Sequence, residues 1–197
     1  GACGILKKGD REAGKYPADP YFEPLYAEAE KLDLPICIHT GSGMPDFSPA
    51  REFSHGQFMR TKGAAINGIL GLILHKVPRR FPKLRIGFCE GVTAWIPIAI
   101  DRLQREMEYG GLRLKHKPEE YFTSGQIFVG CEGNEKALAY AIERVGPEPF
   151  MFASDFPHEI SLGNCMEEIN EILERNDLKP AHKTAILGDN ARRFYQI

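Results

Sequence analysis

Five short runs of apolar residues recur along the chain, and each is followed by a polar loop and a longer segment. The runs are apolar throughout instead of alternating with polar residues, which is typical of parallel strands covered on both faces. Their length favours strands over helices. We therefore predict strands at residues 1–6, 35–40, 83–90, 125–132 and 149–155.

The segments between these runs carry apolar residues at helical spacing. In residues 21–32, the side chains of Phe22, Leu25, Tyr26 and Ala29 fall on one side of a helix. We interpret such stripes as core packing and not as cofactor contacts. Similar stripes occupy residues 65–77, 96–107 and 138–145.

Five parallel βα units are compatible with two architectures, an open doubly wound sheet and part of an eight-stranded barrel. A nucleotide-binding open sheet needs a tight Gly-rich turn after its first strand. The segment "GILKKGDREAG" contains neither GxGxxG nor GxxxxGK[ST]. The pattern therefore favours a barrel-type domain over residues 1–197. Because the chain opens directly on a predicted strand, we also expect that further strands precede it.

Composition and charge narrow the class of ligand. The formal net charge is −2 and the sequence pI is about 6.3, so no basic field favours nucleic acid or an anionic membrane. The longest apolar run, Ile66 to Leu74, is far shorter than the roughly 20 residues that span a bilayer. Five cysteines without a CxxC pair indicate reduced, buried thiols in a cytoplasmic protein. We expect a small-molecule substrate.

Ionisable residues collect where the predicted strands end, and in a barrel these positions converge on the face that carries active sites. Asp155 alone can be a helix N-cap before Pro157, and His39 alone can be a hydrogen-bonded polar residue. Together, an imidazole and a carboxylate form part of the ligand set of a catalytic zinc. The residues at the strand ends are His39, Glu90, Glu132, Asp155 and His158.

Four motifs occur in order over nearly the whole chain: "ICIHTGSG", "RFPKLRIGFCEGVTAWIPIAIDRL", "FMFASDFPHE" and "ILGDNARRFY". Together they resemble the amidohydrolase-related family of metal-dependent hydrolases and decarboxylases. The resemblance implies a (β/α)₈ barrel, of which this chain covers about strands 4 to 8. It also implies one divalent metal, held by His39 after the fifth strand and Asp155 after the eighth. Zn is the expected ion, with Mn as the alternative.

This sequence departs from the family pattern in two ways. A His-x-His pair, which the family carries on its first strand, is absent. Where many members have His-Gly after the sixth strand, this chain has "CEG" with Glu90. We interpret Glu90 as a catalytic proton acceptor near the metal, with a salt bridge to a neighbouring Arg or Lys as the alternative. His158 is a second catalytic candidate. Glu132 is a substrate-binding candidate, with helix capping as its alternative.

Residues 40–61 form a longer connection than is usual after a strand, and we expect a lid or specificity segment there. Arg51 and Arg60 in this segment can hold a substrate carboxylate. We predict a metal-dependent hydrolase acting on a small carboxylate-bearing or aromatic substrate, with decarboxylation as the alternative. The rival from another class is a non-catalytic barrel fragment that packs on a partner chain. Dimers are common among the resembling proteins, so a homodimer is one expected assembly.

Overall fold

Five parallel strands form the centre of the computed structural model, which describes residues 1–39, 63, 66–157, 161 and 163–197. Each strand coincides with or overlaps one of the predicted apolar runs, so these five predictions are confirmed. The strands are shorter than the runs, with three to five residues each. They are β1 (Ile5–Lys8), β2 (Ile36–His39), β3 (Ile86–Phe88), β4 (Ile127–Cys131) and β5 (Phe150–Phe152).

The strands lie in the sheet in the order in which they occur in the sequence, and every neighbouring pair is parallel. An open doubly wound sheet reverses its strand order at a switch point. Among the described residues there is no such reversal, and sequential parallel order is the order of strands in a barrel. In this part of the chain β1 and β5 are the two edges of the sheet and do not pair with each other.

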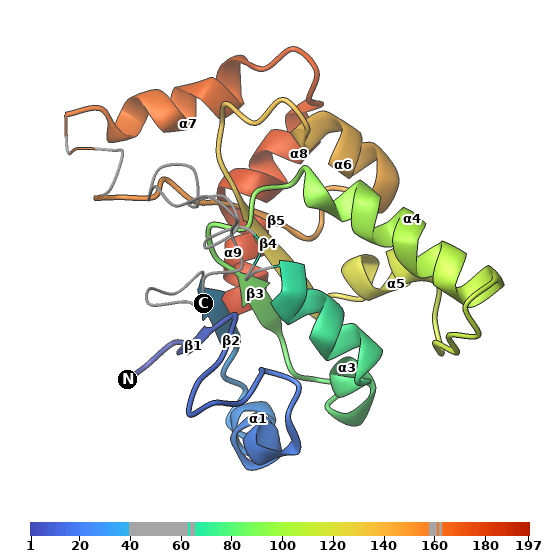
Figure 1. Ribbon diagram of the computed structural model, residues 1–197. Helices are drawn as coiled ribbons and strands as arrows, with labels where there is room; N and C mark the ends of the chain where they lie inside the picture. The colour runs from blue at the N-terminus through green and yellow to red at the C-terminus, as the bar shows by residue number, and fades with distance from the viewer. Residues whose placement is uncertain (40–62, 64–65, 158–160, 162) are drawn as a thin grey trace, which may run out of the picture.

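Helices connect the strands, and α1, α3, α4 and α6 follow one another around the outside of the sheet (Figure 1). Of the helices that the structure describes, none has the length and apolar character needed to cross a membrane. Residues 66–74 are helical as well. The remaining bounds are η1 (Pro20–Phe22), α1 (Glu23–Lys31), α3 (Val77–Arg80), α4 (Trp95–Glu108), α5 (Pro118–Thr123), α6 (Leu138–Val145), α7 (Cys165–Glu174), α8 (Pro180–Thr184), η2 (Ala185–Asp189) and α9 (Asn190–Tyr195).

The main hydrophobic core lies between this helical layer and one face of the sheet. Ile38 of β2, Phe88 of β3 and Ile100 of α4 are fully buried in it, as expected for apolar stripes that face a sheet. Leu25 is the exception, because it is 36% exposed although Tyr26 beside it is buried. The predicted stripe on α1 is therefore narrower than expected, which fits its position at the end of the helical layer (Figure 1).

A second, smaller cluster covers the opposite face of the sheet, here called the inner face. Cys37, Gly87 and Phe128 are register partners on three neighbouring strands and so lie in one row. The ring of Phe194 from α9 packs on this row and is fully buried. A Cβ atom on Gly87 would lie 2.5 Å from Phe194 Cζ. Only glycine at that position leaves room for the ring.

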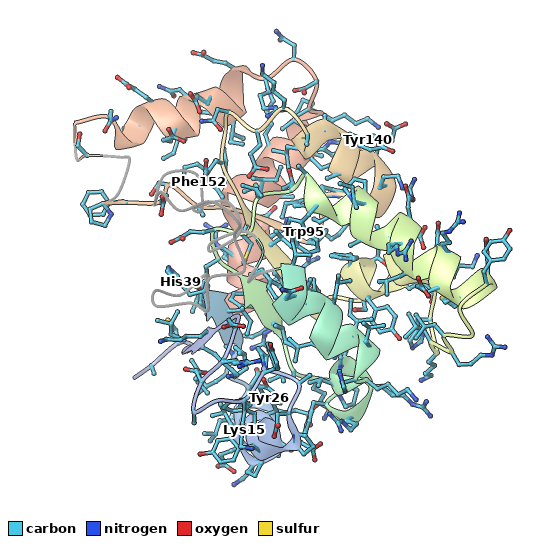
Figure 2. All side chains as sticks on the ribbon, in the orientation of Figure 1. Lys15, Tyr26, His39, Trp95, Tyr140 and Phe152 are labelled. Atoms are coloured by element: carbon cyan, nitrogen blue, oxygen red, sulfur yellow. The ribbon has the colours of Figure 1, made fainter. Side chains whose placement is uncertain are left out.

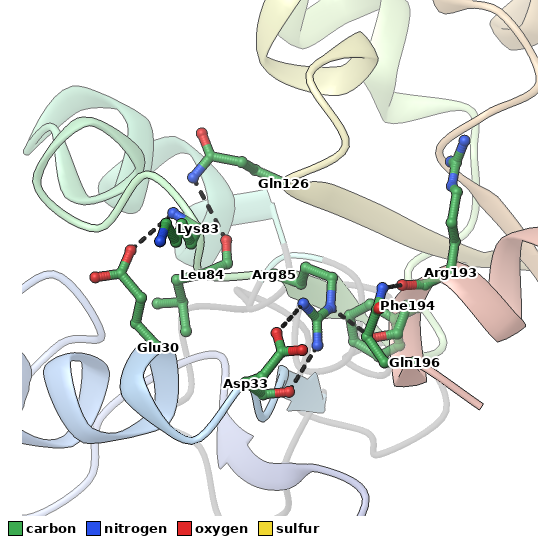
Figure 3. Close-up of polar contacts among 9 residues, drawn as sticks. All are labelled: Glu30, Asp33, Lys83, Leu84, Arg85, Gln126, Arg193, Phe194 and Gln196. Atoms are coloured by element: carbon green, nitrogen blue, oxygen red, sulfur yellow. Dashed lines mark hydrogen bonds and ion pairs between the residues drawn. The ribbon is translucent and has the colours of Figure 1, made fainter.

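Three hydrogen bonds fix α9 at the amino ends of the strands. The side-chain amide of Asn190 donates to the carbonyl oxygens of Pro147 at 2.8 Å and Phe150 at 2.7 Å. Arg85, just before β3, donates from Nε to the carbonyl oxygen of Phe194 at 2.7 Å (Figure 3). Consequently α9 closes the inner face at the amino ends, and the carboxyl ends of the strands point the other way.

We expect the substitution Gly87→Ala to lower the free energy of unfolding by about 1–3 kcal/mol. The new methyl group would collide with the Phe194 ring, which is itself fully buried and packed on Phe128. Gly71→Ala is the matched control, because its nearest neighbour would be Ala18 Cβ at 3.9 Å and alanine favours the helix in which it lies. Urea denaturation measures both. An equal midpoint for the two variants would show that the ring does not occupy this position.

Cysteine usage agrees in part with the prediction. Cys3, Cys37, Cys89 and Cys131 are free thiols, and Cys37 and Cys131 are buried. Cys3 is exposed, contrary to the expectation of buried thiols.

Candidate active site

The carboxyl ends of the strands meet at one edge of the sheet, which we call the carboxyl edge. His39 is the last residue of β2 (Figure 2), and Glu132 follows β4 directly. Glu90 lies two residues beyond the end of β3, and Asp155 lies three residues beyond the end of β5. Because the strands are parallel, the structure brings these four predicted residues to the same edge, as expected for a site in an α/β sheet.

The side chain of His39 belongs to the inner face. Alternate residues of a strand share a face, so His39 lies on the same side as Cys37. Its register partner on the neighbouring strand β1 is Lys8, whose side chain is exposed. Sequence reasoning missed Lys8, since only the strand register shows that this ammonium group is on the same face as the imidazole. A cation is therefore available beside His39.

The clearest contact at the carboxyl edge joins His39 and Glu90. The imidazole Nε2 lies 2.7 Å from Glu90 Oε1, and the two side chains are 38% and 20% exposed. Among the described residues, Glu90 thus contacts the predicted metal ligand. The alternative from the sequence, a salt bridge to Arg or Lys, stays a prediction. A carboxylate bonded to an imidazole fixes the orientation of the ring and holds a proton between the two groups.

The backbone around these residues is held in an uncommon conformation. Glu90, Val92 and Asp155 all have positive φ angles, of 53°, 49° and 56°. Such angles are uncommon for residues other than glycine, and for a β-branched residue such as Val they are outliers that cost free energy. Strained residues of this kind concentrate at functional sites. Two of the three are candidate site residues, which supports a function for the carboxyl edge.

Glu132 and Asp155 each had helix capping as an alternative role. In the described helices that follow them, other residues occupy the N-cap position. The next helix after Glu132 is α6, which begins at Leu138 with Ala137 in the N-cap position. The next described helix after Asp155 is α7, which begins at Cys165 with Asn164 in that position. Neither Glu132 nor Asp155 is the N-cap residue of these helices.

A carboxylate that the sequence did not identify links two of the loops. Glu135 accepts hydrogen bonds on one oxygen from the backbone N–H of Thr93 at 2.6 Å and its hydroxyl at 2.5 Å. Its other oxygen accepts from the backbone N–H of Glu132 at 3.0 Å. The loop after β3 is thereby joined to the loop after β4. The acidic residues of "CEGNE" carried no signal that would have separated Glu135 from Glu132.

A pair of thiols lies on the inner face below the site. A hydrogen bond with Cys89 lowers the pKa of the Cys37 thiol to about 7, although burial acts in the opposite direction. The same contact raises the pKa of Cys89, and burial adds to that effect. Cys37 therefore carries the more acidic of the two thiols, two residues before His39.

Three predicted site residues, Arg51, Arg60 and His158, lie outside the described residues, as does the expected lid of residues 40–61. Within the described ranges, no group of three or more His, Cys, Asp or Glu side chains is arranged to hold a metal ion. His39 and Asp155 are therefore two candidate ligands of an incomplete set.

Comparison with known proteins identifies the family. The family profile described as Amidohydrolase (Amidohydro_2) matches residues 1–197, and the chain belongs to this family. The 2-amino-3-carboxymuconate-6-semialdehyde decarboxylase of Dictyostelium discoideum is 24% identical over 197 residues, covering 96% of this chain and 52% of that protein. The chain thus spans about half the length of this relative. The resemblance inferred from the four motifs is confirmed.

Solved structures support the same relationship. The 5-carboxyvanillate decarboxylase from Sphingomonas paucimobilis has a TM-score of 0.75 and 27% identity, over 98% of this chain and 58% of that one. The 5-carboxyvanillate decarboxylase from Novosphingobium aromaticivorans, complexed with manganese and 4-hydroxy-3-methoxy-5-nitrobenzoic acid, has a TM-score of 0.75 over 99% of this chain and 56% of that one. Its identity is 19%, so this second likeness shows the fold alone.

Proposed function

We propose that this protein is a metal-dependent decarboxylase that acts on an aromatic or unsaturated carboxylic acid. The observation that carries the proposal is the His39–Glu90 contact at the carboxyl edge, in a chain that matches the amidohydrolase family along its whole length. Both relatives with at least 24% identity described above are decarboxylases by name. Decarboxylation, the alternative in the sequence analysis, is thereby better supported than the hydrolysis predicted first.

Hydrolysis of a small carboxylate-bearing substrate remains the second candidate. Glu90 favours it, because a carboxylate is a natural proton acceptor for an attacking water. The two reactions place the same demands on His39 and Asp155, which is why these residues do not distinguish them.

The proposed architecture is a (β/α)₈ barrel in which β1 to β5 are five consecutive strands, the fourth to the eighth. The sequential parallel order supports it, as does the presence of helices around the outside of the sheet. The partial coverage of longer relatives is consistent with a segment of such a barrel. In this arrangement Phe194 fills the lumen at the amino ends and the site opens at the carboxyl ends.

The donor types at the carboxyl edge fit a divalent metal in part. An imidazole and a carboxylate suit Zn or Mn, and His39 and Asp155 are the residues that would hold it. The manganese in the related structure favours Mn over the Zn predicted from the sequence. A bound divalent ion would act as a Lewis acid on the oxygen atoms of the substrate. A metal held by His39 through Nε2 would displace the contact with Glu90.

Glu90 has the role of moving a proton. When a carboxylate leaves a carbon atom as CO₂, the electron pair of the broken C–C bond stays on that carbon and must receive a proton. A carboxyl group released from its contact with His39 is positioned at the same edge to supply it. His158 is the second candidate for this step.

Cationic groups are needed to hold the substrate carboxylate. Lys8 is on the face of the sheet that carries His39, and a Lys ammonium group binds a carboxylate as a point charge. Further substrate-binding candidates are Arg51, Arg60 and Glu132.

The expected homodimer and cytoplasmic location stay predictions.

Release of CO₂ from a small panel of acids tests the proposed function. The panel contains 5-carboxyvanillate and 2-amino-3-carboxymuconate semialdehyde, with a lactone and an amide as hydrolysis substrates. We expect CO₂ release from at least one acid, loss of this activity with a chelator, and recovery with Mn²⁺. Hydrolysis of the lactone or amide without CO₂ release from any acid would transfer the proposal to the second candidate. No turnover of any substrate would favour the non-catalytic fragment.

The substitution Glu90→Gln is expected to reduce kcat by about 10²- to 10⁴-fold, the usual contribution of a proton-transferring side chain. Glutamine keeps the size of the side chain but cannot accept or release a proton. Metal content should not fall, because Gln competes less well than a carboxylate for His39 Nε2. Steady-state kinetics and metal analysis check both results. A variant that loses its metal and keeps its kcat after metal addition would show that Glu90 is only structural.

A further inference from the structure

The turn that carries Glu90 requires an external restraint. Glu90 and Val92 both have left-handed backbone conformations, with φ angles of 53° and 49°. Each such conformation costs free energy and persists only where the surroundings determine it. Without restraint, the turn would relax and move the Glu90 carboxyl group away from His39.

Within the part of the chain that the structure describes, contacts from β2, from Trp95 and from Glu135 help to hold this turn. Glu90 itself bonds to His39. The carbonyl oxygen of Gly91 accepts a hydrogen bond from the indole Nε1–H of Trp95 at 2.8 Å. Thr93, which is fully buried, is held by Glu135 through both its backbone N–H and its hydroxyl.

The Glu135 contact differs from the other two because it reaches a second loop. Its remaining oxygen accepts the backbone N–H of Glu132, so one carboxylate satisfies three donors from two loops. Hydrogen bonds to an ionised acceptor are shorter and stronger than neutral ones. A neutral amide in this place would have one accepting oxygen, and its NH₂ group would face an N–H donor.

The backbone at Glu135 is itself held by hydrogen bonds from Arg175. The guanidinium of Arg175, which follows α7, donates from Nη1 to the carbonyl oxygens of Gly133 at 2.9 Å and Glu135 at 2.6 Å. Asp177 holds the other side of the same guanidinium at 2.9 and 2.7 Å. Hydrogen bonds thus connect the segment between Glu132 and α6 to the loop after β3 on one side and to the end of α7 on the other.

We propose that Glu135 is a positioning residue that sets the distance between the loops of Glu90 and Glu132 and keeps the Glu90 turn in its strained conformation. It acts through Thr93 and does not touch the substrate. Its effect on turnover rests on the proposed function, whereas its effect on the two loops does not. Both effects are measurable separately.

Hydrogen–deuterium exchange of the purified protein tests the restraint without a substrate. In Glu135→Gln we expect amide exchange in residues 90–93 and at Glu132 to rise by about 10-fold or more, the loss expected for a charge-assisted hydrogen bond. Exchange in α1 should not change. The control is Glu106→Gln, which removes a carboxylate paired with the exposed Arg102 at 2.9 Å and should leave both loops unaffected.

Kinetics of the active protein test the consequence for the site. We expect Glu135→Gln to lower kcat by about 10- to 100-fold, the usual effect of losing a group that orients a catalytic residue, with an unchanged metal content. Thr93→Ser retains the hydroxyl and should keep most of the wild-type kcat. Thr93→Val removes the hydroxyl and should lower kcat as Glu135→Gln does. If Glu135→Gln does not fold, the two Thr93 variants decide between the same outcomes.

Two results would overturn the proposal. Unchanged exchange in residues 90–93 of Glu135→Gln would show that the carboxylate does not restrain the turn. Faster exchange with an unchanged kcat would show that the restraint has no role in turnover. An inactive wild-type protein on the whole acid panel would instead count against the proposed function, since the exchange results remain valid without it.

Discussion

His39→Ala is expected to abolish metal-dependent turnover, with a loss greater than about 100-fold. Removal of groups that only orient a metal ligand already costs about 10- to 100-fold in metal affinity or activity, and the loss of a ligand itself exceeds that. Asp155→Ala should likewise lose both the bound metal and turnover, because the proposal makes both side chains ligands of one ion. Metal content after dialysis and the rate of CO₂ release measure the effect.

His116→Ala is the matched control for His39→Ala. His116 also lies beside a carboxylate, with Nδ1 at 3.2 Å from Glu120 Oε2, but on the surface of α5 and its preceding loop. Its removal should change neither metal content nor rate. If His39→Ala and Asp155→Ala differ, so that only one of them loses the metal, the shared-ion account is wrong.

Phe194→Ala is expected to lower the free energy of unfolding by about 3–5 kcal/mol, the usual cost of truncating a buried Phe. The ring is fully buried and makes aromatic contacts with Phe128 and Tyr195, at centroid distances of 5.0 and 4.7 Å. It fills the space over Gly87, so its loss leaves a cavity on the inner face. Tyr109→Ala, at a side chain that is 80% exposed, is the control.

Thermal and urea denaturation of the two aromatic variants separate the possible results. A loss below about 1 kcal/mol for Phe194→Ala would mean that the inner face closes without the ring. The same variant also tests whether the packing of Phe194 at the amino ends influences the metal affinity of the site, which lies at the carboxyl ends. Native-like metal affinity in the folded fraction would show that the packing of α9 and the site are independent.

The strands could be predicted because each depends only on local sequence, whereas their order in the sheet could not be taken from the apolar runs, which are compatible with two architectures. A continuous apolar run of strand length indicates a buried strand wherever it lies in the chain. The carboxyl-edge location of His39, Glu90, Glu132 and Asp155 followed from parallel strands alone. The contact between His39 and Glu90 did not, because strand ends at one edge do not determine which side chains touch.

The missed features all depend on contacts between residues that are distant in sequence. Arg85 and Phe194 are hydrogen-bonded across 109 positions, and Thr93 and Glu135 across 42. The alternation of apolar and polar residues carries no signal for such a pair. The left-handed conformations of Val92 and Asp155 were also unpredictable, since nothing local favours them and only the surrounding structure maintains them.

Residue types alone could not distinguish hydrolysis from decarboxylation. Both reactions use an imidazole and a carboxylate around a divalent ion, and "CEG" made hydrolysis the first prediction. The names of the relatives reverse that order. The same holds for the choice of ion, because an imidazole and a carboxylate suit either Zn or Mn.

Crystals of the protein grown with Mn²⁺ test whether His39 and Asp155 hold one ion, through an anomalous difference map at the manganese absorption edge. We expect one strong peak at bonding distance from both His39 Nε2 and an oxygen of Asp155, with Glu90 displaced from its contact with His39. A map without a peak there, or with His39 still bonded to Glu90 and the ion elsewhere, would contradict this expectation.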